Sequence, residues 1–196
     1  MTGPLTEPGS EPNGSRRSYA EWAARVRVPG GFALTGVYLL WAQPEPRFLF
    51  AGAAVALVGL LLRAWSAGCL EKNQKLATGG PYAYARNPLY LGSAVAGVGF
   101  AIAGGRWWFF LLLALFLAAV YWPVILREQA HLEKLFPAEF PAYARSVPVI
   151  WPRFTSWQGS AAGSFRWRQY WRNREYEAFF AYLLIVLLLW GKMFWM

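Results

Sequence analysis

Residues 106–126 read RWWFFLLLALFLAAVYWPVIL, a run whose only charged residue is Arg106 at its start. An α-helix needs about 20 predominantly apolar residues to cross the hydrocarbon core of a bilayer, so this stretch predicts a transmembrane helix. Three other runs have the same character, and a shorter, weaker one precedes them: 46–65 (PRFLFAGAAVALVGLLLRAW), 88–105 (PLYLGSAVAGVGFAIAGG), 179–195 (FFAYLLIVLLLWGKMFW) and the weaker 29–43 (PGGFALTGVYLLWAQ). We therefore expect an all-α, polytopic membrane protein with about five transmembrane helices.

The composition of the 196-residue chain fits this class and excludes several others. Hydrophobic residues make up 57% of the chain and charged residues only 15%, which excludes an ordinary soluble domain and a disordered chain. One cysteine, Cys69, and one histidine, His131, exclude an internal disulfide and the His/Cys sets that bind zinc, haem or iron–sulfur clusters. All ten acidic residues are glutamates, which excludes aspartate-dependent phosphoryl transfer.

The distribution of Lys and Arg predicts how the chain crosses the membrane. The formal net charge is +9, and 19 residues are Lys or Arg. If the N-terminus is cytoplasmic, only Arg47, Arg106 and Lys192 fall on the outer side, as the positive-inside rule requires. We therefore expect a multi-pass protein of the cell inner membrane, with its C-terminus on the side opposite the cytoplasm. This placement assigns the basic residues to anionic lipid headgroups as partners, and not to nucleic acid.

The spans divide the chain into four parts. The first part is rich in Gly, Pro and Ser at its start and lacks the apolar core of a signal peptide. The third part places Trp167, Tyr170 and Trp171 at i, i+3, i+4 among arginines, which is typical of a helix lying in the membrane interface. The parts are a disordered, polar cytoplasmic tail (1–28), a core with four helices and a cytoplasmic cap (29–152), a basic, aromatic interfacial segment (153–175) and a C-terminal transmembrane helix (176–196).

The first candidate site lies in the cytoplasmic segment before the third helix, where residues 79–90 read GGPYAYARNPLY. Gly79 and Gly80 predict a turn, Asn87 an N-cap and Pro88 the first helical position. The free N–H groups of a helix N-terminus beside basic side chains favour a carboxylate or a phosphate. The alternative is that this segment is only a well-capped helix start.

The second candidate site lies where the fourth helix leaves the membrane, at residues 127–136 (REQAHLEKLF). Glu128 is within a turn of the bilayer boundary, where a charge usually has a partner. The alternative is a surface glutamate paired with Arg127 or Lys134. His131 is expected to be an exposed polar residue, and the Trp122 and Pro123 pair predicts a kink in the helix.

These two segments together resemble a known family. The first carries G-x-Y-x-x-x-R-[HN]-P-x-Y, and the second, about forty residues later, carries a glutamate followed by L-x-x-x-F-x-x-x-[YF]-x-x-Y-x-x-x-V-P. The pattern is similar to that of the isoprenylcysteine carboxyl methyltransferase and phospholipid methyltransferase superfamily of integral membrane enzymes, over roughly residues 63–152. The matching residues are Gly80, Tyr82, Arg86, Asn87, Pro88 and Tyr90, then Glu128, Leu132, Phe136, Phe140, Tyr143, Val147 and Pro148.

The resemblance implies S-adenosyl-L-methionine as methyl donor, held in a cytoplasmic pocket between the start of the third helix and the end of the fourth. It implies a lipid-like acceptor, an isoprenoid or a phospholipid, and no metal. Arg86 and Glu128 are the implied catalytic residues, while Arg127 and Tyr143 are candidate substrate contacts. The implied cofactor contacts are Gln74, Lys75, Leu76, Ala77, Tyr82, Asn87, Pro88, Leu89, Tyr90 and Glu128.

Two other functions stay open at this point. The membrane sterol reductases are similar in their C-terminal helices and use NADPH, although they are expected to add further spans. A non-catalytic lipid-binding or partner-binding membrane protein is the third possibility. It is favoured by Gln129, which replaces a second glutamate, and by Val124, which stands where the prenylcysteine enzymes place a substrate-contacting arginine.

Overall fold

The computed structural model describes residues 13–159 and 163–194, and throughout these residues the regular structure is helical, with no strand. The prediction of an all-α fold is therefore confirmed for this part of the chain. The elements are α1 (Asn13–Trp41), α2 (Pro46–Cys69), a 3₁₀ turn (Gly80–Ala83), α3 (Pro88–Ala103), α4 (Trp108–Phe116), a π-helical turn (Leu117–Tyr121), α5 (Trp122–Leu135), α6 (Phe140–Ser146), α7 (Trp167–Arg172) and α8 (Tyr176–Lys192).

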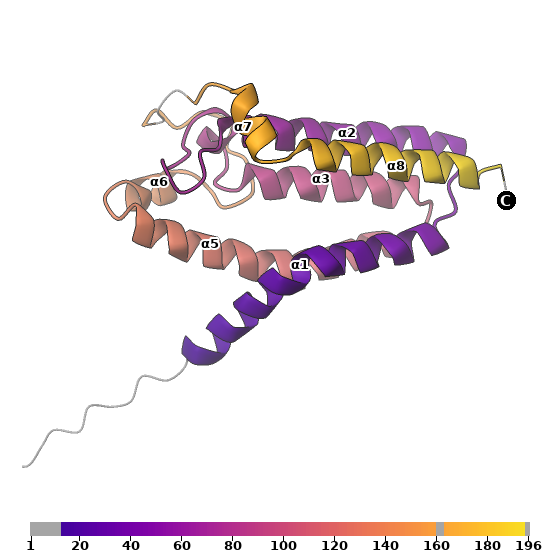
Figure 1. The fold of residues 1–196 in the computed structure, drawn as a ribbon, viewed down its shortest axis with the longest axis horizontal. Helices are drawn as coiled ribbons and strands as arrows, with labels where there is room; N and C mark the ends of the chain where they lie inside the picture. Colours follow the sequence, from indigo (N-terminus) through magenta and orange to yellow (C-terminus); the bar gives the residue numbers. More distant parts are fainter. Residues whose placement is uncertain (1–12, 160–162, 195–196) are drawn as a thin grey trace, which may run out of the picture.

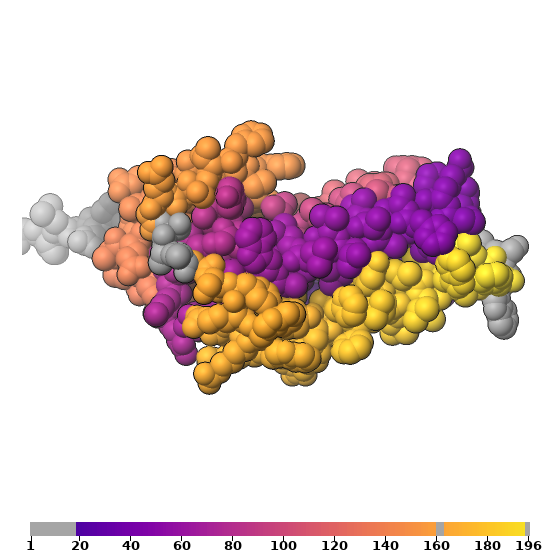
Figure 2. Space-filling model, turned by 90° about the horizontal axis from the view of Figure 1, so that it is seen from above, coloured from indigo at the N-terminus to yellow at the C-terminus, as the bar shows by residue number. Residues whose placement is uncertain are grey.

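The long helices lie side by side as a bundle. Figure 1 shows α2, α3 and α8 running together, with α1 and α5 beneath them and α6 and α7 at one end. Figure 2 shows α8 alongside α2, with the α7 segment at one end of this pair. An apolar core at the other end joins five helices through Tyr38, Leu49, Ala101, Phe109 and Leu189, all of them buried.

Two helices are long and apolar enough to cross a membrane by length and composition. They are α2 and the continuous run Trp108–Leu135, which includes α4, the π-helical turn and α5. The apolar helix α3 has 16 residues and α8 has 17, or about 24 to 26 Å at 1.5 Å per residue, slightly less than a hydrocarbon core of about 30 Å. The lengths and composition of these helices agree with the predicted membrane protein.

The first helix differs from the prediction. We expected a disordered tail to residue 28 and a helix over 29–43, but α1 is continuous from Asn13 to Trp41 and contains Pro29. Residues 16–28 (RRSYAEWAARVRV) hold no Gly or Pro and are rich in Ala and Arg, which favour helix, so polarity here did not mean disorder. The first twelve residues of the predicted tail lie outside the described part.

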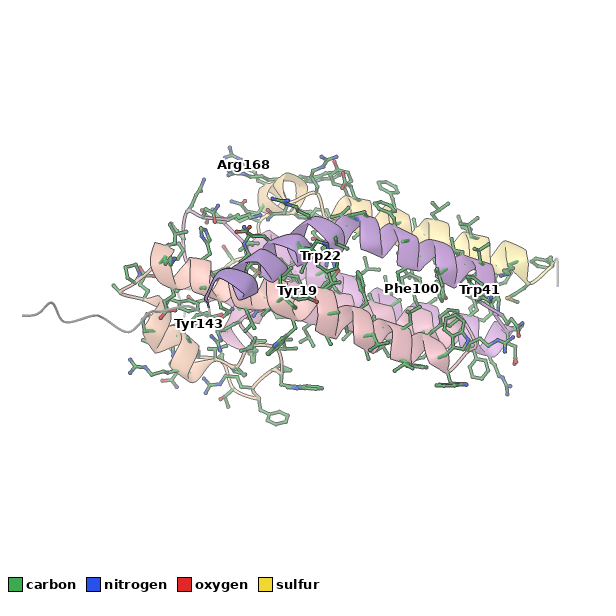
Figure 3. The ribbon with its side chains drawn as sticks, turned by 90° about the horizontal axis from the view of Figure 1, so that it is seen from below. Tyr19, Trp22, Trp41, Phe100, Tyr143 and Arg168 are labelled. Atoms are coloured by element: carbon green, nitrogen blue, oxygen red, sulfur yellow. The ribbon has the colours of Figure 1, made fainter. Side chains whose placement is uncertain are left out.

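The predicted kink at Trp122 and Pro123 corresponds to the π-helical turn, which ends immediately before Trp122. Pro123 has no N–H, so the carbonyl of Ala119, four residues earlier, loses its α-helical donor. The hydroxyl of Tyr19 donates to this oxygen at 2.8 Å, and Figure 3 shows Tyr19 on α1 beside this run. A side chain from α1 thus satisfies the backbone group that Pro123 leaves free.

The short helix α7 packs on the end of α2. Gln169 is buried, and Asn173, which follows the helix, donates its amide to the carbonyl oxygens of Ala67 (2.8 Å) and Leu70 (3.1 Å). The indoles of Trp167 and Trp171 are exposed. Because α7 is anchored in this way, Glu175 at the start of α8 is brought against Arg63 near the end of α2.

Candidate functional site

A cavity of about 460 Å³ lies at the end of the bundle where α6 and α7 are found. This volume is typical of a site for a small molecule. In Figure 3, Tyr143 and Arg168 mark this end of the bundle, and Trp41 marks the other. The walls come from α1, α2, the segment between α2 and α3, the start of α3, α5, α6 and the segment that leads from α7 into α8. We refer to it as the polar cavity.

One side of the polar cavity carries a carboxylate network. The hydroxyl of Tyr90 donates to Oε1 of Glu128 at 2.7 Å, and Nη1 of Arg27 donates to the same hydroxyl oxygen at 2.9 Å. Nη1 of Arg27 also lies 4.0 Å from Oε1 of Glu128. The partner of Glu128 is therefore on α1 and α3, and the predicted alternative of pairing with Arg127 or Lys134 is not what the structure has.

The other side of the polar cavity holds a buried cluster of hydrogen-bond donors. Nη1 of Arg86 donates to Oε1 of Gln129 at 2.6 Å. Three further atoms are buried and have no hydrogen-bond partner among the described residues: Nε of Arg86, Nε2 of Gln129 and the hydroxyl of Tyr82. Such orphaned groups are rare in native proteins because each costs about 1–3 kcal/mol, so three at one cavity require acceptors from bound water or from a ligand.

The ionisation of this cluster follows from its burial. Burial lowers the pKa of Arg86 from its ordinary value, although a guanidinium stays protonated at neutral pH. Burial raises the pKa of Tyr82, so its hydroxyl keeps its proton and remains a donor. The lining of the cavity therefore includes unpaired donors and a cation as well as the carboxylate of Glu128.

The loop that carries Arg86 is held by the segment after α6. The amides of Arg86 and Asn87 donate to the carbonyls of Pro148 (2.8 Å) and Val149 (3.1 Å). Asn87 occupies the N-cap position of α3, as predicted, but its side chain makes no capping bond; its Nδ2 donates to the carbonyl of Val149 at 3.0 Å. Gly80, at φ +58°, supplies the left-handed conformation of the predicted turn.

Most of the residues predicted for the site lie around the polar cavity. Three do not: Gln74 and Arg127 are exposed away from it, and Pro88 is fully buried in the first turn of α3. Tyr143 lines the cavity, and its hydroxyl donates to the backbone carbonyl of Tyr82 at 2.8 Å. The predicted residues in the wall are Lys75, Leu76, Ala77, Tyr82, Arg86, Asn87, Leu89, Tyr90, Glu128 and Tyr143.

Several lining residues were not predicted for the site. Arg27 lies within the part expected to be disordered, and Glu175 pairs with Arg63 across 112 positions of sequence. Of these two arginines, Arg63 carried the clearer sequence signal, because it is a charged residue within an apolar run. His131, expected to be simply exposed, is exposed and also lines the cavity. Among the described residues, no group of three or more His, Cys, Asp or Glu side chains could hold a metal ion.

A second cavity, of about 320 Å³ and lined mainly by apolar side chains, lies deeper in the bundle. Its walls come from α1, α2, α3, α4, the π-helical turn and α8. Arg63 and Tyr121 line both this apolar cavity and the polar cavity. The two spaces are therefore neighbours, and the π-helical turn places Tyr121 between them.

The polar cavity and the apolar cavity beside it thus lie in a bundle of helices, two of which are long and apolar enough to cross a membrane. The model of the phospholipid methyltransferase family matches residues 46–139, just under half of the chain. This match includes α2, α3, α5 and the segment between α2 and α3, which together carry most of the polar cavity.

Two relatives are named as metal resistance proteins. The chain is 32% identical over 149 residues to the cobalt-zinc-cadmium resistance protein CzcN of Cupriavidus metallidurans, covering 74% of this chain and 67% of that protein. It is also 32% identical over 138 residues to the nickel-cobalt-cadmium resistance protein NccN of Alcaligenes xylosoxydans xylosoxydans, covering 69% and 62%. No solved structure matches the chain.

The chain therefore belongs to the phospholipid methyltransferase family, part of the isoprenylcysteine and phospholipid methyltransferase superfamily. The resemblance seen in the sequence motif is confirmed. At this level the protein is a methyltransferase of a membrane family.

Proposed function

We propose that the protein is an integral membrane methyltransferase that uses S-adenosyl-L-methionine and transfers its methyl group to a lipid-like acceptor. The observation that carries the proposal is that three residues lining the polar cavity have unpaired buried donors, with the carboxylate of Glu128 in the same cavity. A methionine moiety carries a carboxylate and an ammonium group. Its charges are complementary to the arginine and the glutamate that line this cavity.

The donor set fits this cofactor. Arg86, Gln129 and Tyr82 would hold the methionine carboxylate, because their free N–H and O–H groups need an acceptor. Glu128, held in place by Tyr90 and Arg27, would bind the ammonium group and offset positive charge nearby. When bound, S-adenosyl-L-methionine supplies a methyl group on a positively charged sulfur. The residues of the chain then only need to orient donor and acceptor and to exclude water.

The apolar cavity supports a lipid-like acceptor. Its walls are apolar apart from a few groups such as Arg63, Ser93 and Thr35, and it adjoins the polar cavity at Tyr121. An isoprenoid or acyl chain in this space would lead its head group toward the donor. We further propose that the chain crosses the cell inner membrane five times, with the polar cavity and N-terminus at the cytoplasmic face and the C-terminus on the other side.

The test is a titration of the purified, detergent-solubilised protein with S-adenosylhomocysteine and with NADPH by isothermal calorimetry. We expect S-adenosylhomocysteine to bind and Glu128→Ala to abolish binding. Glu133→Ala is the matched control, because Glu133 is an exposed glutamate on the same helix, outside the cavity, and should bind normally. Binding of NADPH alone would favour a reductase, and binding of neither ligand a non-catalytic protein; either result would overturn the proposal.

A further inference from the structure

The outer face of α7 is built from two tryptophans and two arginines. Trp167 and Trp171 are 65% and 59% exposed. Arg168 and Arg172, which follow them in the sequence, are also exposed, and Figure 3 shows Arg168 at the outer edge of the molecule. At about 100° per residue, these four side chains fall within an arc of about 140° of the helix. The buried Gln169 lies outside this arc, so the aromatic and basic side chains share one exposed face.

The two arginines of this face have no carboxylate to neutralise them. Among the described residues, Arg168 and Arg172 form no ion pair. The other two arginines of the segment, Arg166 and Arg174, each pair with a glutamate. Exposed indoles favour the boundary between headgroups and acyl chains, and guanidinium groups form strong hydrogen bonds with phosphate. The face is therefore complementary to an anionic phospholipid in both its apolar and its charged part.

The aromatic face of α7 continues onto an exposed apolar side of α8. The ring centroids of Trp171 and Tyr176 are 5.1 Å apart, and those of Tyr176 and Phe180 are 6.5 Å apart. Phe180 is followed at i+4 and i+7 by the exposed Leu184 and Leu187. On a helix that crosses a membrane, such a row faces acyl chains. In the proposed topology, α7 therefore lies where α8 leaves the hydrocarbon core, level with the phospholipid headgroups.

The turn after α7 forms part of the wall of the polar cavity. Asn173 and Glu175 both line that cavity. Asn173 donates to two carbonyl oxygens at the end of α2, and Glu175 pairs with Arg63 on α2. Between them, Arg174 has φ +57°, a left-handed conformation that residues with a side chain rarely adopt. The turn is therefore held by its contacts with α2, and a displacement of α7 would displace the cavity wall.

From this arrangement we propose that the outer face of α7 is a docking site for an anionic phospholipid of the cytoplasmic leaflet. The phosphate would accept hydrogen bonds from Arg168 and Arg172, which line neither the polar nor the apolar cavity, so this lipid is not the methyl acceptor. Bound lipid fixes α7 and, through Asn173 and Glu175, the wall of the polar cavity. The consequence, which rests on the proposed function, is that anionic lipid strengthens binding of S-adenosyl-L-methionine.

The experiment adds phosphatidylglycerol or phosphatidylcholine with the same acyl chains to the detergent-solubilised protein. Thermal shift measures lipid binding without requiring the cofactor. We expect phosphatidylglycerol to raise the melting temperature, and phosphatidylcholine and inorganic phosphate to leave it unchanged. The double variant Arg168→Gln with Arg172→Gln should need about thirtyfold more phosphatidylglycerol for the same response. Lys134→Gln with Arg145→Gln removes two exposed cations outside α7 and both cavities; this matched control should respond as the wild type does.

Two further measurements separate docking from a folding defect. Arg168→Lys with Arg172→Lys keeps both charges and should keep the preference for phosphatidylglycerol. Calorimetry with S-adenosylhomocysteine should give an affinity at least about fivefold higher in phosphatidylglycerol than in phosphatidylcholine, and this difference should disappear in the glutamine variant.

The docking site is overturned if phosphatidylcholine or phosphate acts as strongly as phosphatidylglycerol, or if phosphatidylglycerol has no effect. It is also overturned if the glutamine variant responds like the wild type, or if the lysine variant or the control loses the response as completely as the glutamine variant. An S-adenosylhomocysteine affinity that is independent of the lipid would overturn the coupling to the polar cavity. Failure of S-adenosylhomocysteine to bind in either lipid would instead overturn the proposed function, and the thermal shift would still decide the docking site.

Discussion

Tyr82 and Tyr143 are two buried phenols in contact that differ in whether the hydroxyl has a partner. Burial raises the pKa of both, so each keeps its proton at neutral pH. The hydroxyl of Tyr143 donates to the carbonyl of Tyr82 at 2.8 Å, whereas that of Tyr82 has no partner within the described residues. The first hydroxyl supports the fold, and the second is available to a ligand in the polar cavity.

We therefore expect opposite effects from the two Tyr→Phe changes. Tyr82→Phe should leave the free energy of unfolding unchanged or raise it by about 1 kcal/mol, because it removes an unpaired buried hydroxyl, yet weaken binding of S-adenosylhomocysteine about tenfold. Tyr143→Phe should lower the free energy of unfolding by about 1 kcal/mol through loss of its hydrogen bond. Calorimetry and thermal unfolding measure the two quantities. Unchanged affinity in Tyr82→Phe would show that its hydroxyl does not contact the ligand.

For single residues, the sequence predicted which residues form the site better than it predicted their hydrogen-bond and ion-pair partners. The motif marked Arg86 and Glu128, and both line the polar cavity. It treated Gln129 as a departure from the family, but the amide oxygen of Gln129 accepts a hydrogen bond from Arg86. Glu128 contacts a tyrosine on α3 and Arg27 on α1, a pairing that depends on how three helices meet.

Among the helices, the contact between α2 and α3 depends most on glycines, which lack a side chain and let the two backbones approach closely. A Cβ atom at Gly59 would meet the backbone of Ala96 and Gly92, and one at Gly52 would meet the backbone carbonyl of Gly99. These helices therefore pack backbone to backbone, as small residues allow in membrane bundles. The close approach also places Arg63 of α2 against α3.

We expect Gly59→Ala to lower the free energy of unfolding by roughly 2 kcal/mol or more, since rigid backbone atoms would have to separate. The matched control is Gly36→Ala on α1, where a Cβ would meet nothing within 4 Å. That change should be neutral or stabilising by up to about 1 kcal/mol, because alanine is the better helix former. Thermal unfolding in detergent, followed by tryptophan fluorescence, measures both. Equal melting temperatures for the two variants would argue against backbone packing of α2 on α3.

Element boundaries show why local patterns were only partly sufficient. The starts of α2 at Pro46 and α3 at Pro88 coincide with the predicted runs because proline and apolar content mark them locally. The start of α1 does not coincide with the predicted run. The polar residues before position 29 extend the helix without an apolar run to mark it. The π-helical turn was predicted only as a kink, because Pro123 signals a break and not the form it takes.

At the scale of the whole molecule, the connections at the two ends of the bundle differ in charge. Figure 1 shows the α1–α2 and α3–α4 connections and the end of α8 at one end of the bundle, and the α2–α3 and α5–α6 connections at the other. The second end carries the polar cavity and its cluster of Lys and Arg residues. This arrangement is the one expected if the cavity faces the cytoplasm.

The orientation can be tested by cysteine labelling in a Cys69→Ser background. A thiol introduced by Ala138→Cys, in an exposed position before α6, should react with a membrane-impermeant maleimide only from the cytoplasmic side. Arg106→Cys, exposed at the opposite end, is the matched control and should react only from the outer side. Labelling of both thiols from one side would contradict the proposed topology, and exchange of the two sides would reverse it.

The sequence by itself determined the helical class, the apolar runs, the charge asymmetry and the two motif segments. Each of these properties depends on residues that are close together in the sequence, so it can be recognised without knowledge of the fold. Only the tertiary structure decided that Arg27 joins Glu128 and that Arg63 pairs with Glu175 between two cavities. Such contacts depend on the rotation and depth of each helix against its neighbours. Packing across the whole bundle sets both, and no local stretch of sequence carries that information.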